Sequence, residues 1–295
     1  MDSNYKTLPA PATITQQIAN LKELELVIED ETFAASILSD VSYYRLIKAY
    51  SIGLKDKNGP FHPGVTLEQI VELYLFNANF RQLLFSQIEK IEVNFRCRVS
   101  NYFSITYGSL GYWDVNNFDN AQHYSKFRSI LKSDIKSNSQ SPFIKSFMVN
   151  YGKKKIPFYA VVEVLSFGTL SKFYKNMKSQ DKTAIAKMYG LKYSYLESWI
   201  ESISYVRNVC AHYGRLYNVS LTISPTLYKT YTSRGISNHR IFGVLCCMKH
   251  LIINDEHWLE FVDSIEALFD KYPHVDTSLM GFPSDWKVIL TDPIS

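Results

Sequence analysis

The chain has little of what builds turn-rich, disulfide-stapled or membrane-spanning proteins. Glycine and proline number only 12 and 10 in 295 residues, too few for a many-turned β-sandwich of this length. The four cysteines form no C-x-x-C pair and two of them, Cys246 and Cys247, are adjacent, which excludes a disulfide framework and a zinc ribbon. The longest uncharged apolar run near the C-terminus, Ile241 to Met248, falls far short of the roughly 18 to 20 residues that cross a bilayer.

The N-terminal residues also lack the basic and then apolar order of a secretory signal. With 46% hydrophobic and 20% charged residues, the composition is that of a globular chain long enough to bury a sizeable core. We therefore expect a reduced, soluble, cytoplasmic protein with no membrane partner.

The net charge of +4 conceals two opposed regions. Residues 145–187 hold nine lysines and two acidic residues, whereas residues 255–292 hold nine acidic residues and two lysines. Screening confines each field to roughly 8 to 10 Å, so the two need not cancel on a folded surface. The basic segment is suited to a polyanion such as RNA, or is simply a solvated helical face.

Apolar residues recur at spacings of three and four along most of the chain, which predicts a mainly α protein. Helices are expected to begin at a capping box at Thr13, at Asp30 and at Pro157, the last with an interruption at Gly168. Residues 66–108 should form two helices or one bent helix. Residues 193–212 should form another helix, with Gly214 at its C′ position. Alternation over 219–223 predicts one short strand. We expect a single domain, 1–295, with N-terminal helices and a loop (1–64), a helical core (65–215) and a C-terminal elaboration (216–295).

One constellation carries chemistry, the hexad Arg207-Asn208-Val209-Cys210-Ala211-His212. On a helix Asn208 and His212 lie on one face, while Arg207 and His212 differ by about 140° and about 7.5 Å of rise and do not touch. Two copies across a two-fold axis would bring two arginines and two histidines to one cleft, a set suited to cleaving RNA. The alternative is an interface or core helix whose Asn and His only satisfy backbone groups.

No cluster of metal-ligand residues accompanies Arg207 and His212, so we expect neither a metal nor another cofactor. Cleavage would then use the 2′-hydroxyl of the RNA as nucleophile, with Arg207, Asn208 and His212 as the catalytic residues.

The hexad resembles the nuclease motif of HEPN proteins, and the segments around it resemble the abortive-infection AbiD/AbiF family of bacterial phage-defence proteins. The likeness rests on Ile18 to Leu21, Leu38 to Leu46, Tyr74 to Asn77 with Arg81, Ile91 to Arg96, Tyr107-Gly108 with Trp113, Leu165 to Ser171, and Met280 to Pro283 with Trp286. Asn77 and Phe80 depart from the family's acidic and aliphatic residues, which affects no catalytic assignment.

The resemblance implies an all-α, HEPN-like helical bundle with N- and C-terminal helical elaborations, used as a homodimer. It also implies a toxin-like RNase that stays inactive until infection. Its partners would be the RNA substrate and a structured regulatory RNA or an antitoxin.

Two further groups of residues are assigned roles on this basis. Glu89, Glu92 and Arg96 share one face of the long helix, either as a surface ion-pair ladder or as groups that orient Arg207 or His212. The candidates for RNA contact are Lys153, Lys154, Lys155, Lys172, Lys175 and Arg215. Two functions remain open: an endoribonuclease, and a non-catalytic module that binds RNA or a protein partner as a sensor or regulator.

Overall fold

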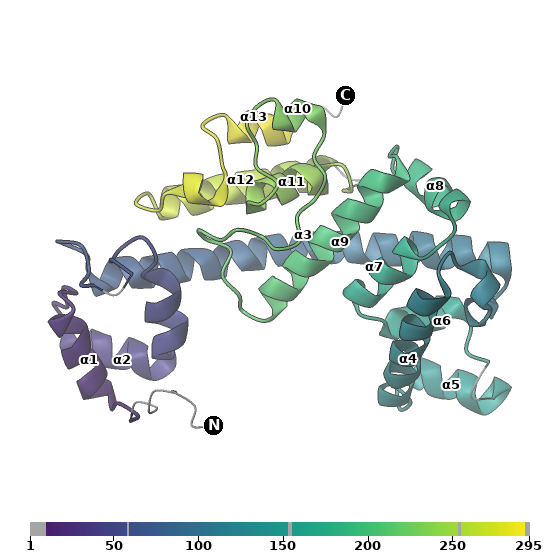
Figure 1. The fold of residues 1–295 in the computed structure, drawn as a ribbon, viewed down its shortest axis with the longest axis horizontal. Helices are drawn as coiled ribbons and strands as arrows, with labels where there is room; N and C mark the ends of the chain where they lie inside the picture. Colours follow the sequence, from purple (N-terminus) through teal and green to yellow (C-terminus); the bar gives the residue numbers. More distant parts are fainter. Residues whose placement is uncertain (1–9, 58, 153–154, 253–254, 293–295) are drawn as a thin grey trace, which may run out of the picture. The chain divides into compact units, whose positions relative to one another are not determined.

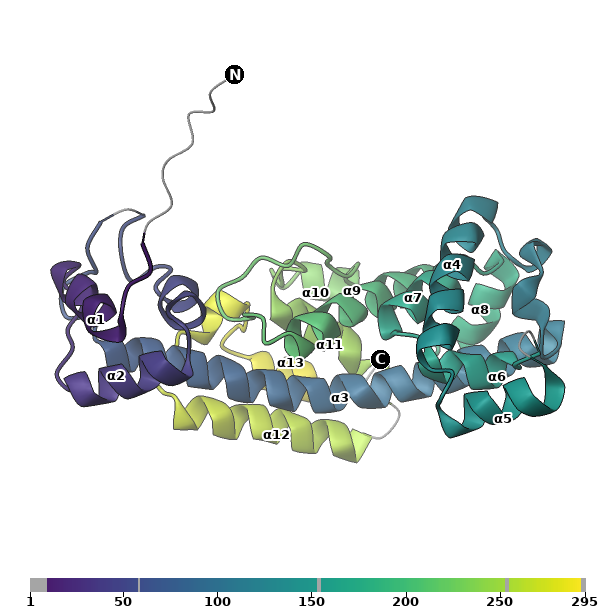
Figure 2. The same ribbon diagram turned by 90° about the horizontal axis from the view of Figure 1, so that it is seen from below.

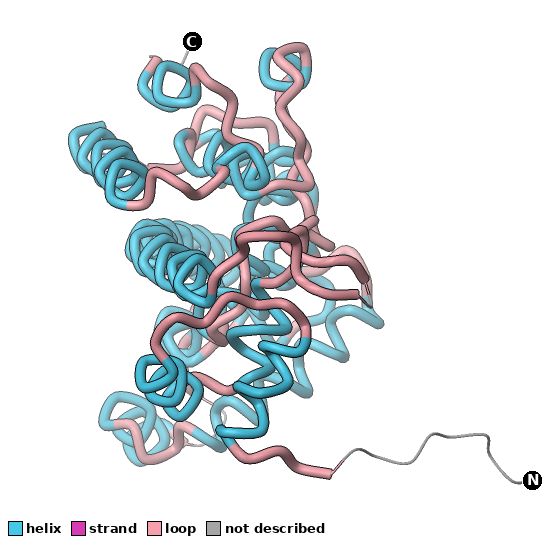
Figure 3. The backbone as a smooth tube through the Cα atoms, turned by 90° about the vertical axis from the view of Figure 1, so that its left-hand side faces the viewer, coloured by secondary structure: helices cyan, strands magenta, loops and turns pink. Residues whose placement is uncertain are grey.

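The computed structural model describes residues 10–57, 59–152, 155–252 and 255–292. These residues form helices, turns and four isolated β-bridges, with no strand among them (Figure 3). The predicted all-α class is confirmed. The predicted strand at 219–223 is wrong: this segment is a loop, in which the Leu221 amide donates to the carbonyl of His239.

Contacts divide the chain into two compact units, residues 1–79 and 80–295. The division falls inside helix α3 (Leu67–Tyr107), which begins in the first unit and continues in the second. The expected single domain, with boundaries after residues 64 and 215, stays a prediction.

The first unit contains the short helices α1 and α2 (Figure 1), each of which begins directly after a capping residue. Thr13 and Gln16 form the predicted capping box of α1 (Ile14–Glu23), and the Asp30 carboxylate caps α2 (Glu31–Asp40). A π-helical turn (Tyr44–Lys48) follows, and Thr66 and Gln69 bond reciprocally at the start of α3. Apolar side chains from these elements and from the loop before α3 fill the core of this unit, among them Leu21, Ala34, Leu46, Phe61 and Ile70.

Helix α3 is one continuous helix of 41 residues, so of the two predicted alternatives, two helices or one bent helix, the first is wrong. No glycine or proline lies between Leu67 and Tyr107, so nothing in the chain forces a break. Its buried residues follow a three-four spacing across the whole length, for example Leu84, Ile88, Ile91, Phe95 and Val99.

In the second unit the remaining helices lie along residues 80–107 of α3 (Figures 1 and 2). In chain order these are α4 (Ala121–Ser137), α5 (Pro142–Tyr151), α6 (Phe158–Val161), α7 (Phe167–Lys175), α8 (Ser179–Lys187), α9 (Tyr193–Ala211), α10 (Lys229–Thr232), α11 (Ile241–Lys249), α12 (Asp255–Lys271) and α13 (Trp286–Thr291). Short 3-10 turns lie at Gly111–Trp113, Val115–Asn117, Val162–Val164 and Thr277–Met280.

Helix α9 contacts α7, α8 and α11, and α7 also contacts α4. An aromatic cluster anchors this side of the core: the Phe158 and Phe173 rings stack at 4.7 Å, and Phe103 lies 5.0 Å from Phe173. Such pairs add roughly 0.5 to 1.5 kcal/mol beyond the burial of their area. The cluster therefore holds α6 and α7 against α3, and α7 supports α9.

The predicted interruption at Gly168 is wrong. The chain leaves the helical conformation at Leu165, and the Ser166 hydroxyl caps α7 by accepting from the Thr169 amide at 3.1 Å. Gly168 then lies in the first turn of α7. The serine cap, and not the glycine, therefore sets this boundary.

Candidate active site at the end of α9

Helix α9 carries Arg207 and Asn208 near its C-terminal end, and His212 is its C-terminal cap. The helix forms because one stripe of apolar residues faces the core: Leu196, Trp199, Ile200, Ile203, Val206 and Cys210. Burial raises the pKa of Cys210 to about 12, so its thiol stays protonated near neutral pH and packs as an apolar group. Asn208 and His212 are exposed, and Arg207 is about one-third exposed at 32%.

The turn that ends α9 is a Schellman motif. The Gly214 amide donates to the Val209 carbonyl at 2.7 Å, and the Tyr213 amide donates to the Cys210 carbonyl at 3.2 Å. Tyr213, with φ of 59°, takes the left-handed conformation that was predicted for Gly214. That prediction is wrong by one residue, and the difference costs about 1 to 2 kcal/mol of backbone strain at Tyr213.

Gly214 is required for a different reason, a close approach to α9. A Cβ at this position would lie 2.7 Å from Val209 Cγ1 and 3.0 Å from the Val209 oxygen. The carbonyl of Gly214 also accepts a hydrogen bond from Nη1 of Arg81 at 3.1 Å. Arg81 belongs to α3 and is buried, so it ties the turn next to His212 to the long helix.

Arg207 is held by Glu92, which comes from α3. Its Nε lies 3.3 Å from Glu92 Oε2, and its guanidinium carbon lies 5.6 Å from the centre of the Phe85 ring. Its two terminal amino groups make no hydrogen bond within the described part of the chain. The guanidinium is thus fixed through one nitrogen while two donor groups stay available.

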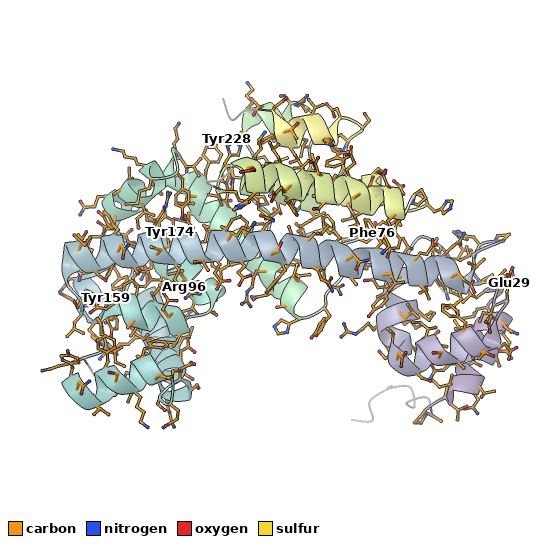
Figure 4. The ribbon with its side chains drawn as sticks, turned by 180° about the vertical axis from the view of Figure 1, so that it is seen from behind. Glu29, Phe76, Arg96, Tyr159, Tyr174 and Tyr228 are labelled. Atoms are coloured by element: carbon orange, nitrogen blue, oxygen red, sulfur yellow. The ribbon has the colours of Figure 1, made fainter. Side chains whose placement is uncertain are left out.

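Glu92 is itself anchored by Arg96, which Figure 4 labels on α3. Arg96 Nη2 donates to Glu92 Oε1 at 2.6 Å, and Arg96 Nη1 donates to the carbonyls of Val162 and, at 3.0 Å, Leu165. The side chains of Arg96 and Glu92 are only 10% and 14% exposed. The predicted face of α3 therefore contains an ion pair that also reaches Arg207.

The third residue of that predicted group, Glu89, is not brought to the site. It is exposed, and within the described residues it makes no interaction with Arg207 or His212. Arg81, by contrast, supports the site through its bond to the Gly214 carbonyl, although the sequence did not predict this role. A signal was present, because an arginine at an apolar position of a helix needs a buried partner.

Asn208 and His212 share the exposed side of this helix end. The His212 amide donates to the Asn208 carbonyl at 3.0 Å, as in any helical turn. Their side chains make no hydrogen bond to each other or to another described residue. The catalytic roles of Arg207, Asn208 and His212 stay predictions.

The predicted RNA-contact residues lie in three places. Lys153 and Lys154 fall outside the described residues, while Lys155 is exposed and Arg215 is half-buried. Lys172 and Lys175 line a hollow of about 360 Å³ between α4, α7 and α9, together with His123, Lys126 and Glu201. The sequence could not predict that His123 and Lys126 of α4 lie at this hollow, because no sequence pattern indicates that α4 packs beside α7.

Part of the positive charge of residues 145–187 is neutralised in the fold. Lys175 Nζ lies 2.8 Å from Glu201, and the buried Lys182 lies 2.9 Å from Glu197. Both carboxylates belong to α9, which lies outside that basic segment of the sequence. Lys126 and Lys172 have no carboxylate partner in the described residues, so they carry the free charge of the hollow.

Metal-binding and membrane-spanning groups are both missing from the part of the chain that the structure describes. It holds no group of three or more His, Cys, Asp or Glu side chains placed to bind a metal ion. No helix among the same residues is long and apolar enough to span a bilayer.

A family model described as Abi-like protein matches residues 36–218. The match includes Glu92, Arg96, Arg207 and His212, and it ends shortly after the turn that closes α9. No curated protein and no solved structure matches the chain.

Proposed function

The chain belongs to the Abi-like protein family, and from that link to abortive infection we propose that it is an endoribonuclease of a bacterial phage-defence system. One observation carries the proposal: Glu92 fixes Arg207 through Nε, and an exposed histidine, His212, follows five residues later at the same braced helix end. A residue that only stabilised the fold would have no need of two open guanidinium amino groups at the surface.

The chemistry follows from these groups. The RNA 2′-oxygen attacks the neighbouring phosphorus, the bond to the 5′-oxygen breaks, and a 2′,3′-cyclic phosphate forms. An imidazole takes the proton from the 2′-hydroxyl, and a second group returns a proton to the leaving 5′-oxygen. The terminal amino groups of Arg207 donate to the phosphate oxygens as their negative charge increases.

Acid and base roles need two groups, and one chain offers one histidine at this helix end. We therefore propose that the enzyme is a homodimer in which two α9 ends face each other across a two-fold axis. Each copy contributes Arg207 and His212 to a shared cleft. A strict monomer at micromolar concentration by light scattering, with full activity, would contradict this.

The RNA path continues along α9 toward the basic hollow. Glu201, at the hollow, and Asn208 are seven residues apart, so they lie on the same face and about 10 Å apart along the helix axis. Lys126 and Lys172, which line the same hollow as Glu201, supply ammonium groups with no carboxylate partner in the described residues. A single strand on this face would contact both.

Expression in a bacterial host tests the proposal. Wild type should arrest growth and fragment RNA, whereas His212→Ala at equal abundance should do neither. Equal arrest by both proteins, with intact RNA, would favour the non-catalytic binding module. Because an active RNase must be restrained in a healthy cell, a structured RNA or an antitoxin is the regulatory partner that we propose.

A further inference from the structure

A second cavity, of about 660 Å³, lies in the second unit near the N-terminal end of α9. Its wall comes from the segment before α9 and the first turn of α9, from Tyr228 and α10, from the end of α11 and from α13. Tyr195 on this wall precedes His212 by 17 residues, which is about 25 Å along the helix. The volume falls in the range of roughly 300 to 1,000 Å³ typical of small-molecule pockets. None of the residues proposed for RNA cleavage lines it.

Aromatic rings form one side of this cavity. The centres of the Tyr195 and Tyr228 rings lie 4.5 Å apart, and Tyr228, which Figure 4 labels, lies 5.2 Å from His250. Behind them the buried Trp199 contacts His250 at 5.3 Å and donates from Nε1 to the Thr226 carbonyl at 2.7 Å. The rings are therefore fixed from behind, while Tyr195 and Tyr228 remain half-buried at the cavity.

His250 belongs to the aromatic wall and not to the charged groups. Burial, and to a smaller extent the charge of Lys249, lowers its pKa to about 4, so its ring is neutral near neutral pH. Its Nε2 lies 2.9 Å from the Tyr231 hydroxyl, which fixes the ring in the wall.

Positive charge surrounds the aromatic wall. Four cationic side chains line the cavity, Lys192, Lys229, Arg234 and Lys249, against the single carboxylate of Asp292. Arg234 pairs with Asp285 at 3.1 Å, and Lys249 donates to the carbonyls of Ile289, at 3.0 Å, and Asp292. Lys192 and Lys229 are exposed and have no carboxylate partner in the described residues.

We propose that this cavity binds a nucleotide, with the base against Tyr195 and Tyr228 and the phosphates against Lys192 and Lys229. A nucleotide combines a flat π surface with concentrated negative charge, and the cavity offers a partner to each. A simple inorganic anion would gain nothing from the ring wall, and a neutral aromatic compound would gain nothing from the unpaired lysines. This inference does not depend on the proposed ribonuclease activity.

Calorimetric titration of the 295-residue protein with ATP, GTP and UTP, with adenosine and with inorganic phosphate tests the proposal. At least one nucleotide should bind with micromolar affinity, and adenosine and phosphate should each bind at least tenfold more weakly. The Lys192→Ala/Lys229→Ala double variant should lose at least tenfold in nucleotide affinity. Lys187→Ala, an exposed lysine of α8 outside the cavity, should bind as wild type does.

Ring contact is tested separately. Tyr195→Phe should keep nucleotide affinity, and Tyr195→Ala should lose about tenfold, the usual effect of removing one stacked ring. His212→Ala should bind the nucleotide unchanged, so loss of RNA cleavage and loss of this site can be told apart.

Three results would overturn the assignment. The first is no nucleotide binding to wild type at millimolar concentration; if the double lysine variant also binds an RNA oligomer more weakly, these lysines are assigned to RNA. The second is an unchanged nucleotide affinity in the double lysine variant. The third is phosphate binding as tightly as a nucleotide.

Discussion

Glu92 and Arg207 bond side chain to side chain across 115 residues of sequence, with Arg207 Nε 3.3 Å from Glu92 Oε2. The other oxygen of the same carboxylate accepts from Arg96 at 2.6 Å. Because Glu92 and Arg96 both belong to α3, that helix fixes the position of the guanidinium that α9 carries. Glu92 is therefore a positioning residue for Arg207.

Replacing Glu92 with glutamine removes the negative charge that binds Arg207 but keeps the size of the side chain. We expect kcat for RNA cleavage to fall about ten- to a hundredfold, with a much smaller change in KM, because the reacting groups are misplaced. Loss of one charged hydrogen-bond partner should also lower the free energy of unfolding by about 1 to 3 kcal/mol.

Glu89→Gln is the matched control, because Glu89 lies on the same helix, one turn earlier, and is exposed. It should change neither kcat nor stability. If both variants lost activity equally, or if Glu92→Gln kept full kcat, Glu92 would not be positioning Arg207.

The turn after His212 makes a stability prediction. Gly214→Ala would place a Cβ 2.7 Å from Val209 Cγ1, so we expect a loss of about 1 to 3 kcal/mol in urea unfolding. In Gly168→Ala the nearest atom, Ser166 Oγ, lies 4.0 Å from the new Cβ, within helix α7. That control should be neutral or stabilising by up to about 1 kcal/mol. Equal losses in the two variants would contradict this description of the turn.

RNA binding should weaken with salt, with a log–log slope of about −0.7 for each phosphate bound on a single strand. The Lys126→Ala/Lys172→Ala double variant should make the slope shallower by about 0.7 for each phosphate that is no longer neutralised. A triple variant that changes Lys153, Lys154 and Lys155 to Ala tests the other predicted RNA-binding lysines in the same way. Lys271→Ala, on α12, is the control. If none of these variants changed the slope, neither the lysines of the basic hollow nor Lys153 to Lys155 would contact RNA phosphates.

His250 predicts how stability depends on pH. Its folded pKa, about 4, lies below the unfolded value near 6.5, so the unfolded chain binds the proton more readily. The stabilising contribution is complete above about pH 6.5 and is lost as the pH falls toward 4. His250→Gln removes this titration, so its melting temperature should fall less than that of wild type between pH 7 and pH 5. An equal fall in both proteins would contradict a buried neutral His250.

Much of the local structure could be predicted because it depends on neighbours in sequence. Thr13 with Gln16, the Asp30 cap, and the helix that carries Arg207 and His212 all follow from spacings of three or four residues. The two misplaced helix boundaries also have local causes, because each depends on residues close together in sequence. The Ser166 cap sets the boundary that the sequence predicted at Gly168, and Tyr213 takes the left-handed conformation that was predicted at Gly214.

The parts that could not be predicted depend on contacts between distant segments. The spacing of Glu89, Glu92 and Arg96 marked one face of α3 but could not tell which carboxylate meets Arg207. The Arg81 bond to the carbonyl of Gly214 and the joining of α4 with α7 around the basic hollow also require the packed helices. Likewise, the charge of a segment in sequence does not show that Glu197 and Glu201, from another helix, neutralise two of its lysines.

The most direct test of the proposed ribonuclease is the chemistry of the cut ends made by purified protein in EDTA. We predict 2′,3′-cyclic phosphate and 5′-hydroxyl ends, and no cut where the 2′-hydroxyl is replaced by hydrogen. His212→Ala should lower the rate by roughly 10² to 10⁴, Arg207→Ala by a comparable factor, and Asn208→Ala by less. Metal-dependent cleavage that leaves 5′-phosphate ends, or full activity in His212→Ala, would contradict the proposed mechanism.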